Sequence, residues 1–241
     1  MTNPVVSDRP PPLPSVFDQA FLTNVEGTGE LILIRHGQQH LPSGLGGPVG
    51  EMHDAALSDT GRRQARLVGE RFAAQRIDAV YASGLSRAYD TGVEVARYHG
   101  MTPTVVDDLR EVGVFRDLPP DKSPLEVLGR QGLLGIRSKM LRDRSWDVYP
   151  FSESSADFRR RTVSAIEGIA VTHPGERVVI ACHGGVICAY LGWILGVRQD
   201  MWFRPAHTSV NVVRVKDQVR AVESTGDSSH LVTADGDMRT Y

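Results

Sequence analysis

The stretch Glu30-Leu-Ile-Leu-Ile-Arg35, followed directly by His36-Gly37, decides the fold of this chain. A short apolar run bounded by charged residues is typical of a strand that is buried on both faces, as in a parallel sheet covered by helices. A second run of this kind, Arg177-Val-Val-Ile-Ala-Cys182, leads into His183-Gly184-Gly185. We therefore expect two buried strands that each end at a histidine.

The residues between these runs alternate between helical and strand patterns. Helices are expected over 59–74, 85–99, 154–172 and 184–195, short strands over 78–81 and 104–106, and a hairpin over 207–215 and 218–222. Strands that alternate with helices indicate a parallel sheet covered on both faces. The predicted fold is therefore a three-layer α/β architecture with a mostly parallel central sheet, helices on both faces and an antiparallel edge strand.

The chain is expected to form one main domain. Residues 1–28 carry a cluster of prolines and predict an arm that precedes the fold. The domain is predicted over 29–225, with an insertion or lid at about 113–150 that contains a helix over 124–141. Residues 226–241 predict a polar C-terminal tail.

Composition limits the class of protein. Hydrophobic residues make up 41% of the 241 positions, and no run is long enough to span a bilayer, so we expect a soluble globular protein without membrane contact. A net charge of -2 argues against nucleic acid as a partner. Cys182 and Cys188 predict buried free thiols, and the N-terminus does not resemble a signal peptide, so a cytoplasmic location is the default. A homodimer is left open.

Three short motifs carry possible chemistry. Arg35-His36-Gly37 places a guanidinium beside an imidazole at a strand end, where a phosphate would fit. Arg87 falls in the first turn of a predicted helix. His183-Gly-Gly opens another helix, whose free N–H groups favour an anion. Taken singly, each motif has an ordinary alternative: a surface turn, a solvated arginine and a core histidine.

Together these motifs resemble the histidine phosphatase superfamily, also called phosphoglycerate-mutase-like. The resemblance covers most of residues 30–222 and rests on matches that follow the family's order. They are Leu-Ile-Arg-His-Gly at 33–37, Leu-Ser-Asp-Thr-Gly with Gln-Ala at 57–65, Ser-Gly-Leu-Ser-Arg-Ala at 83–88, Leu-Arg-Glu at 109–111, Glu153 with Asp157-Phe158, and Cys-His-Gly-Gly-Val-Ile at 182–187.

The resemblance implies a role for each central residue. It makes His36 the nucleophile, Arg35, Arg87 and His183 the phosphate clamp, and Glu111 the proton donor, with no metal and no other cofactor. Guanidiniums beside an imidazole disfavour its protonation and balance charge on the phosphoryl oxygens. A surface glutamate paired with Arg110 or Arg116 is the alternative for Glu111.

The match departs from the family pattern after His36. Gln38 and Gln39 follow where family members often carry Glu-Thr or Gln-Thr, and Pro42 stands where an Asn is common. We expect Gln38, Ser43 and Gly184 to contribute to substrate binding. His40 and His53 are expected at the pocket mouth rather than in a metal site.

The sequence therefore predicts an enzyme that hydrolyses a small phosphorylated substrate through a phosphohistidine on His36. The residues after Glu111 do not match the long run that follows the catalytic glutamate in the classical mutases, so hydrolysis is favoured. Phosphoglycerate mutase-type phosphoryl transfer is the alternative. A binding module that has kept the pocket but lost turnover is a third interpretation.

Overall fold

A six-stranded sheet forms the centre of the computed structural model, which describes residues 15–40, 46–234 and 236–241. The strand order is β3-β2-β4-β1-β5-β6. The strands are β1 (Gly29–Arg35), β2 (Ala79–Ala82), β3 (Thr104–Val105), β4 (Arg177–Cys182), β5 (Val210–Lys216) and β6 (Val219–Asp227). The pairs among β1 to β4 are parallel, whereas β5 and β6 form an antiparallel edge. The predicted sheet is confirmed.

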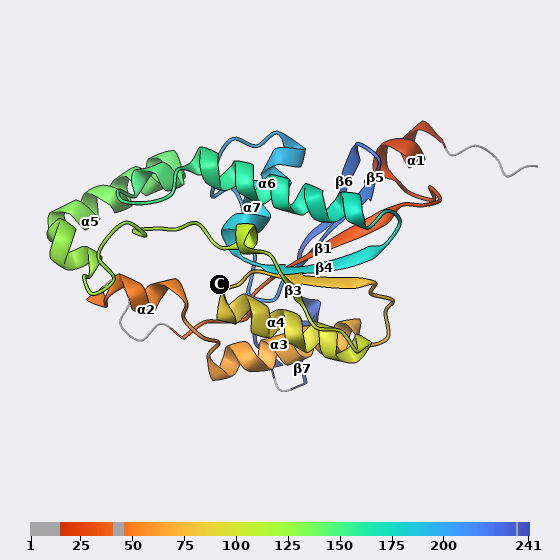
Figure 1. The fold of residues 1–241 in the computed structure, drawn as a ribbon, viewed down its shortest axis with the longest axis horizontal. Helices are drawn as coiled ribbons and strands as arrows, with labels where there is room; N and C mark the ends of the chain where they lie inside the picture. Colours follow the sequence, from red (N-terminus) through yellow and green to blue (C-terminus); the bar gives the residue numbers. More distant parts are fainter. Residues whose placement is uncertain (1–14, 41–45, 235) are drawn as a thin grey trace, which may run out of the picture.

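Helices cover both faces of the sheet, as predicted (Figure 1). They are α6 (Ser155–Thr172) and α7 (Gly184–Leu195) on one face, and α3 (Asp59–Phe72) and α4 (Ser86–Ala96) on the other. Successive side chains of a strand point to opposite faces, so β1 contributes to both layers. Leu31 and Leu33 join the core beneath α6 and α7, whereas Ile32 and Ile34 join the core beneath α3 and α4. This division explains why the run is apolar at every position.

The segment over 113–150 lies beyond one end of the sheet, where α5 (Pro124–Asp143) extends away from the other helices (Figure 1). Ser123 caps α5, because its hydroxyl accepts a hydrogen bond from the Glu126 backbone N–H at 3.1 Å. The helix is interrupted at Gly129, where φ is 64°. A small apolar cluster that includes Val49 and Phe115 joins the segment to α2 (Val49–His53). The predicted helix is confirmed, and the role of the segment as a lid stays a prediction.

Short elements complete the fold. They are α1 (Val16–Phe21), η2 (Arg97–His99), η3 (Asp107–Leu109), η4 (Trp146–Val148), η5 (Ser229–Leu231), β7 (Val232–Thr233) and β8 (Gly236–Asp237). Of the predicted arm, residues 1–14 lie outside the described residues. Helix α1, which we did not predict from the sequence, lies in the remainder, where Lys216 Nζ also donates to the Glu26 carbonyl at 2.5 Å. No helix in the described part of the chain has the length and apolar character to cross a bilayer.

The start of α3 is pressed against the loop that follows His36. The Ser58 hydroxyl accepts from the Gly61 N–H at 3.0 Å and donates to Gln38 Oε1 at 2.8 Å. A Cβ at Gly61 would overlap the Gln38 carbonyl oxygen, and one at Gly37 would overlap the Gly61 carbonyl. Both glycines therefore permit an approach of two backbones that no other residue allows.

This contact predicts opposite effects for two glycine-to-alanine substitutions in helices. Gly61→Ala should lower the free energy of unfolding by about 1–3 kcal/mol, because the overlap forces the backbones apart. Gly168→Ala in α6, where a Cβ meets open space, should raise it by about 0.5–1 kcal/mol. Denaturant unfolding measures both, and equal stability of the two variants would contradict the close-contact explanation.

Candidate active site

Two histidines meet at the carboxyl ends of adjacent strands. β1 and β4 pair in parallel with Arg35 opposite Cys182, and the His36 N–H donates to the Cys182 carbonyl at 2.9 Å. His183 directly follows the last residue of β4, and its ring centroid lies 5.1 Å from that of His36. Only 3% of His36 and 0% of His183 are exposed. The pairing of two strands thus places two imidazoles in one buried volume.

A hydrogen bond orients the His36 ring. His36 Nδ1 lies 2.7 Å from the Gly37 carbonyl oxygen, which can only accept, so Nδ1 carries the ring proton. In the neutral ring Nε2 then holds a lone pair, toward which Arg87 Nε donates at 3.3 Å. Nε2 is therefore the nitrogen available to attack an electrophile.

Arg87 is held in place by contacts around the start of α4. The Ser86 N–H donates to Asp54 Oδ1 at 2.7 Å, which satisfies a free donor at the helix start. The Thr91 hydroxyl donates to the Arg87 carbonyl at 2.7 Å and accepts from the Gly37 N–H at 3.1 Å. Since Thr91 joins α4 to the loop after β1, Arg87 and His36 keep a fixed relation.

Two buried nitrogens beside the His36 ring have no hydrogen-bond partner within the described chain. Arg35 donates through Nη1 to the Pro205 carbonyl at 2.6 Å, but its Nε has no partner. His183 Nε2 lies 2.9 Å from the Ser83 hydroxyl, whereas His183 Nδ1 has none. Buried polar atoms are nearly always paired, so this unused capacity suits a ligand that accepts hydrogen bonds.

Burial sets the charge of the site. It is the foremost reason that the pKa values of His36 and His183 lie well below the ordinary histidine value, and the charges of Arg35 and Arg87 act in the same direction. Burial also lowers the pKa of Arg35 to about 10, which leaves the guanidinium charged at neutral pH. The site therefore combines neutral imidazoles with cationic guanidiniums, an environment that attracts an anion.

Glu111, which follows η3 in the chain, lies against the N-terminal end of α7. The Glu111 carboxylate accepts hydrogen bonds from the Gly185 N–H and from the N–H of the next residue, Val112, both at 3.1 Å. A Cβ at Gly185 would overlap Glu111 Oε1, so the carboxylate reaches this position only because residue 185 is a glycine. The described contacts include no ion pair of Glu111 with Arg110 or Arg116. The alternative of a surface glutamate is therefore not what the structure shows.

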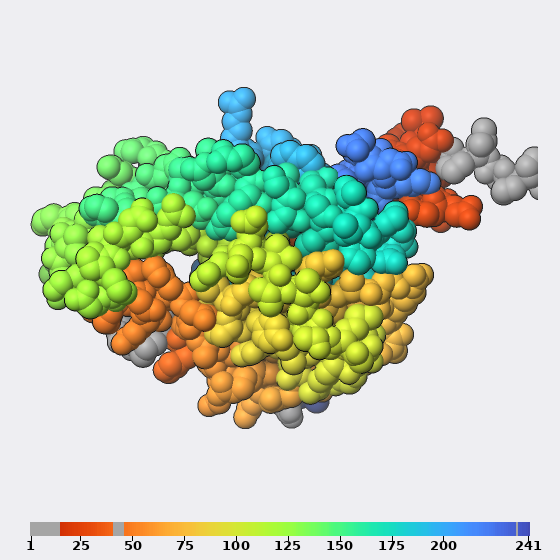
Figure 2. Space-filling model, viewed as in Figure 1, coloured from red at the N-terminus to blue at the C-terminus, as the bar shows by residue number. Residues whose placement is uncertain are grey.

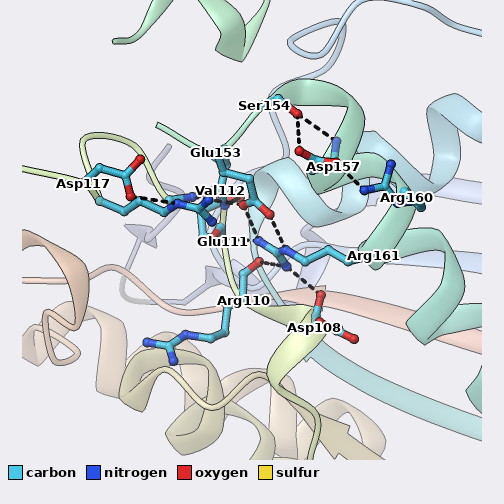
Figure 3. A network of polar contacts seen from close by, with 12 residues as sticks. Asp108, Arg110, Glu111, Val112, Asp117, Glu153, Ser154, Asp157, Arg160 and Arg161 are labelled. Carbon is cyan, nitrogen blue, oxygen red and sulfur yellow. Dashed lines mark hydrogen bonds and ion pairs between the residues drawn. The ribbon is translucent and has the colours of Figure 1, made fainter. Parts of the chain in front are cut away.

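Arg161 holds the backbone around Glu111 (Figure 3). Its guanidinium contacts both carboxylate oxygens of Glu153 at 2.7 Å and donates to the carbonyls of Asp108 and Arg110 at 2.7 and 2.8 Å. Arg161 was not among the residues predicted from the sequence. The sequence signal that could have indicated Arg161 is its position eight residues after Glu153, which belongs to one of the matched motifs.

These groups border one cleft of about 640 Å³. Its lining includes Arg35, His36, Arg87 and Glu111, and Figure 2 shows the surface hollowed between the orange segment that contains α2 and the yellow-green segment near residue 115. His183 is not among the lining residues, but its ring contacts that of the lining residue His36, with the centroids 5.1 Å apart. The structure thus brings the five central predicted residues together.

The other predicted binding residues are placed differently. Gln39 lines the cleft, whereas the Gln38 side chain is engaged by Ser58 at the start of α3. Gly184 borders a second cavity next to Arg35. Ser43 and Pro42 lie outside the described residues. The binding roles of Gln38, Ser43 and Gly184 stay predictions.

His207 is a further residue near His36 that we did not predict. Its ring centroid lies 5.5 Å from that of His36, and its Nδ1 lies 2.8 Å from the Thr240 hydroxyl. Thr240 also accepts a hydrogen bond from Gln64, whose Oε1 accepts from the Gln38 N–H at 2.8 Å. The predicted polar tail therefore packs against the site rather than lying apart from it.

Comparison with known proteins decides the family. The sequence model of the histidine phosphatase superfamily (branch 1) matches residues 31–228. The chain belongs to this superfamily. Histidine phosphatases of known structure share its fold: a mycobacterial glucosyl-3-phosphoglycerate phosphatase aligns with a TM-score of 0.68 at 22% identity, over 83% of this chain and 100% of that chain.

Relatives within the histidine phosphatase superfamily carry different activities in their names. A metal-independent phosphoserine phosphatase of Arabidopsis thaliana is 29% identical over 84% of this chain and 83% of its own length. A probable phosphoglycerate mutase of Yersinia pestis is 26% identical over 84% of this chain and 94% of its own length. The chain is thus an enzyme of this superfamily, and the comparisons name both phosphatases and mutases.

The buried histidines predict how stability depends on pH. The pKa of His207 is lowered to about 3 and that of His230 to about 4, and burial is the main cause for both. Since these values lie below the unfolded value of about 6.5, the unfolded state binds more protons, and the free energy of unfolding should fall as pH drops from 6.5 to 5. His207→Gln should reduce this slope by about 1.4 kcal/mol per pH unit, the contribution of one proton.

Denaturant unfolding at several pH values checks this expectation. Gln218→Asn, which exchanges one neutral amide for another at an exposed position, is the control and should keep the native slope. An unchanged slope in His207→Gln would show that the His207 ring takes up a proton in the folded protein.

Proposed function

We propose that the protein hydrolyses phosphomonoesters through a phosphohistidine formed on His36 Nε2, with Glu111 as the proton donor. The observation that carries this proposal is the state of the His36 ring: its Nδ1 proton is held by the Gly37 carbonyl, and its Nε2 lone pair faces the Arg87 guanidinium. In-line attack on phosphorus requires such a neutral nitrogen beside donors that bind phosphoryl oxygens.

The first half-reaction transfers the phosphoryl group to the enzyme. The Nε2 lone pair forms the P–N bond while the bond between phosphorus and the ester oxygen breaks, and Glu111 gives its proton to the departing alkoxide. Arg35 and Arg87 supply positive charge, and both guanidiniums and the neutral His183 ring supply hydrogen bonds to the other three phosphoryl oxygens. Arg35 Nε and His183 Nδ1, which have no hydrogen-bond partner among the described residues, support this assignment.

The second half-reaction releases phosphate. Water attacks the phosphohistidine and gives a proton to the Glu111 carboxylate, the P–N bond breaks, and the electron pair returns to Nε2. Glu111 is protonated again and His36 is neutral, so the cycle is closed. The expected steady-state kinetics are ping-pong.

Trapping of the phosphoenzyme tests the nucleophile. After rapid mixing with 4-nitrophenyl phosphate, an acid-labile phosphoryl group should map to His36, and phosphate should be released. His36→Ala should lose both label and turnover, whereas His40→Ala, four residues along the chain and exposed, should retain both. Label on another residue, or turnover in His36→Ala, would overturn the proposal.

The role of Glu111 is tested by comparing leaving groups. Glu111→Gln cannot donate a proton, so it should lower kcat/KM for an alkyl phosphate about 10²–10⁴-fold. The loss for 4-nitrophenyl phosphate should be much smaller, because nitrophenolate departs without protonation. Equal losses for both esters would show that Glu111 acts by some means other than proton donation.

Mutase-type transfer is the second candidate, because a probable phosphoglycerate mutase is among the relatives. With 3-phosphoglycerate as substrate, we expect release of inorganic phosphate. Conversion to 2-phosphoglycerate without phosphate release would instead establish the mutase activity.

A further inference from the structure

A second cavity, of about 440 Å³, adjoins the catalytic cleft. Arg35, Glu111 and Trp146 line both spaces, so the two adjoin at these residues. In the proposed reaction the Glu111 carboxylate lies beside the ester oxygen of the leaving group, to which it gives a proton. The second cavity therefore begins at the place where the organic part of a phosphomonoester is attached.

The walls of this cavity are mainly apolar. They include Cys188 on α7 and the consecutive residues Met201, Trp202 and Phe203. Trp202 Nε1 donates to the Cys188 carbonyl at 3.0 Å, and the Cys188 thiol donates to the Phe203 carbonyl at 3.1 Å. Burial raises the pKa of the Cys188 thiol to about 12, so the thiol is neutral. The polar atoms of these walls are thus used within the protein, and the surface left for a ligand is aromatic and aliphatic.

Asp200 fixes the walls rather than offering a charge to a ligand. Its buried carboxylate accepts from Arg159 Nε at 2.8 Å, from the Ser155 hydroxyl at 2.6 Å and from the Trp146 N–H at 2.9 Å. The last contact joins the segment that carries Trp146 to the segment that carries Met201. Both walls are therefore pre-formed, which lowers the entropy cost of binding.

The remaining charged residue of the cavity is Arg204. It is exposed, and its guanidinium lies over the Tyr241 ring, 5.5 Å from the centroid. By contrast, the catalytic cleft is bordered by Asp107, Asp108, Arg110 and Arg116 in addition to the catalytic groups. The two spaces thus differ in character: charged side chains surround the catalytic cleft, whereas Cys188 and the run from Met201 to Phe203 give the second cavity a largely apolar wall.

We infer that the second cavity receives the organic group of the substrate, and that this group is an apolar alcohol of about the size of a phenylalkyl chain. The inference rests on the proposed phosphatase function, since the phosphoryl group must sit at His36 for the attached group to pass Glu111 and Trp146. Apolar surface removed from water on binding would favour such esters over small polar ones.

The test compares two esters of primary alcohols, 3-phenylpropyl phosphate and glycerol 3-phosphate, so that the leaving groups are chemically alike. The native protein should show kcat/KM at least tenfold higher for the phenylpropyl ester. Met201→Asp, which places a carboxylate in the cavity wall, should lower this preference at least fivefold. Leu195→Asp, at the exposed end of α7 outside the cavity, is the matched control and should leave the preference unchanged.

The outcomes separate this inference from the proposed function. Turnover of both esters through labelled His36, with no preference for the phenylpropyl ester, would overturn the inference alone. The inference would also be overturned if Met201→Asp folds, as judged by its melting temperature, and keeps the native preference for the phenylpropyl ester. Absence of label and of phosphate release with both esters would instead overturn the phosphatase function.

Discussion

The parallel pairing of β1 with β4 is the constraint on which the rest of the site depends. Neighbouring strands lie about 4.8 Å apart, so residues that leave them side by side must share a small volume. His36 and His183 do so, with ring centroids 5.1 Å apart. Both rings are buried, and Arg35 and Arg87 bring in positive charge that the neutral imidazoles do not balance. A phosphoryl dianion is the kind of ligand that would relieve the repulsion between these guanidiniums.

The proposed catalytic groups are held largely through contacts with the backbone. Arg161 binds the carbonyls of Asp108 and Arg110, which precede Glu111. The Gly185 N–H binds the Glu111 carboxylate, and Thr91 connects the loop after β1 to α4. Backbone groups cannot change rotamer, so donors and acceptors fixed in this way keep their direction when charge develops in a reaction. Electrostatic preorganisation of this type is usually the largest contribution to enzymatic rate enhancement.

The sequence was sufficient to predict the sheet, its helices and the central residues. Buried strands such as 30–35 and 177–182 are local patterns, and the short motifs at their ends have fixed spacing. What the sequence could not indicate depends on contacts between distant residues. Arg161 resembles any helix arginine until its carbonyl partners, some 50 residues earlier, are known. Likewise, nothing local distinguishes Gln38, which binds Ser58, from Gln39, which lines the cleft.

The contacts of the tail have a consequence for folding. Gln64 on α3 and Thr240 lie 176 positions apart and are joined by a hydrogen bond. Because Gln64 also binds the Gln38 N–H, this bond links the loop after His36 to Thr240, which contacts His207. Contacts of such long range form late, because the chain entropy of closing the loop must be overcome first. A chain that has assembled only β1 and its helices would hold His36 without the surroundings that keep its ring neutral and oriented. In the proposed mechanism, phosphorylation of His36 would therefore require the completed fold, and the fraction of molecules that accept a phosphoryl group would measure the native population.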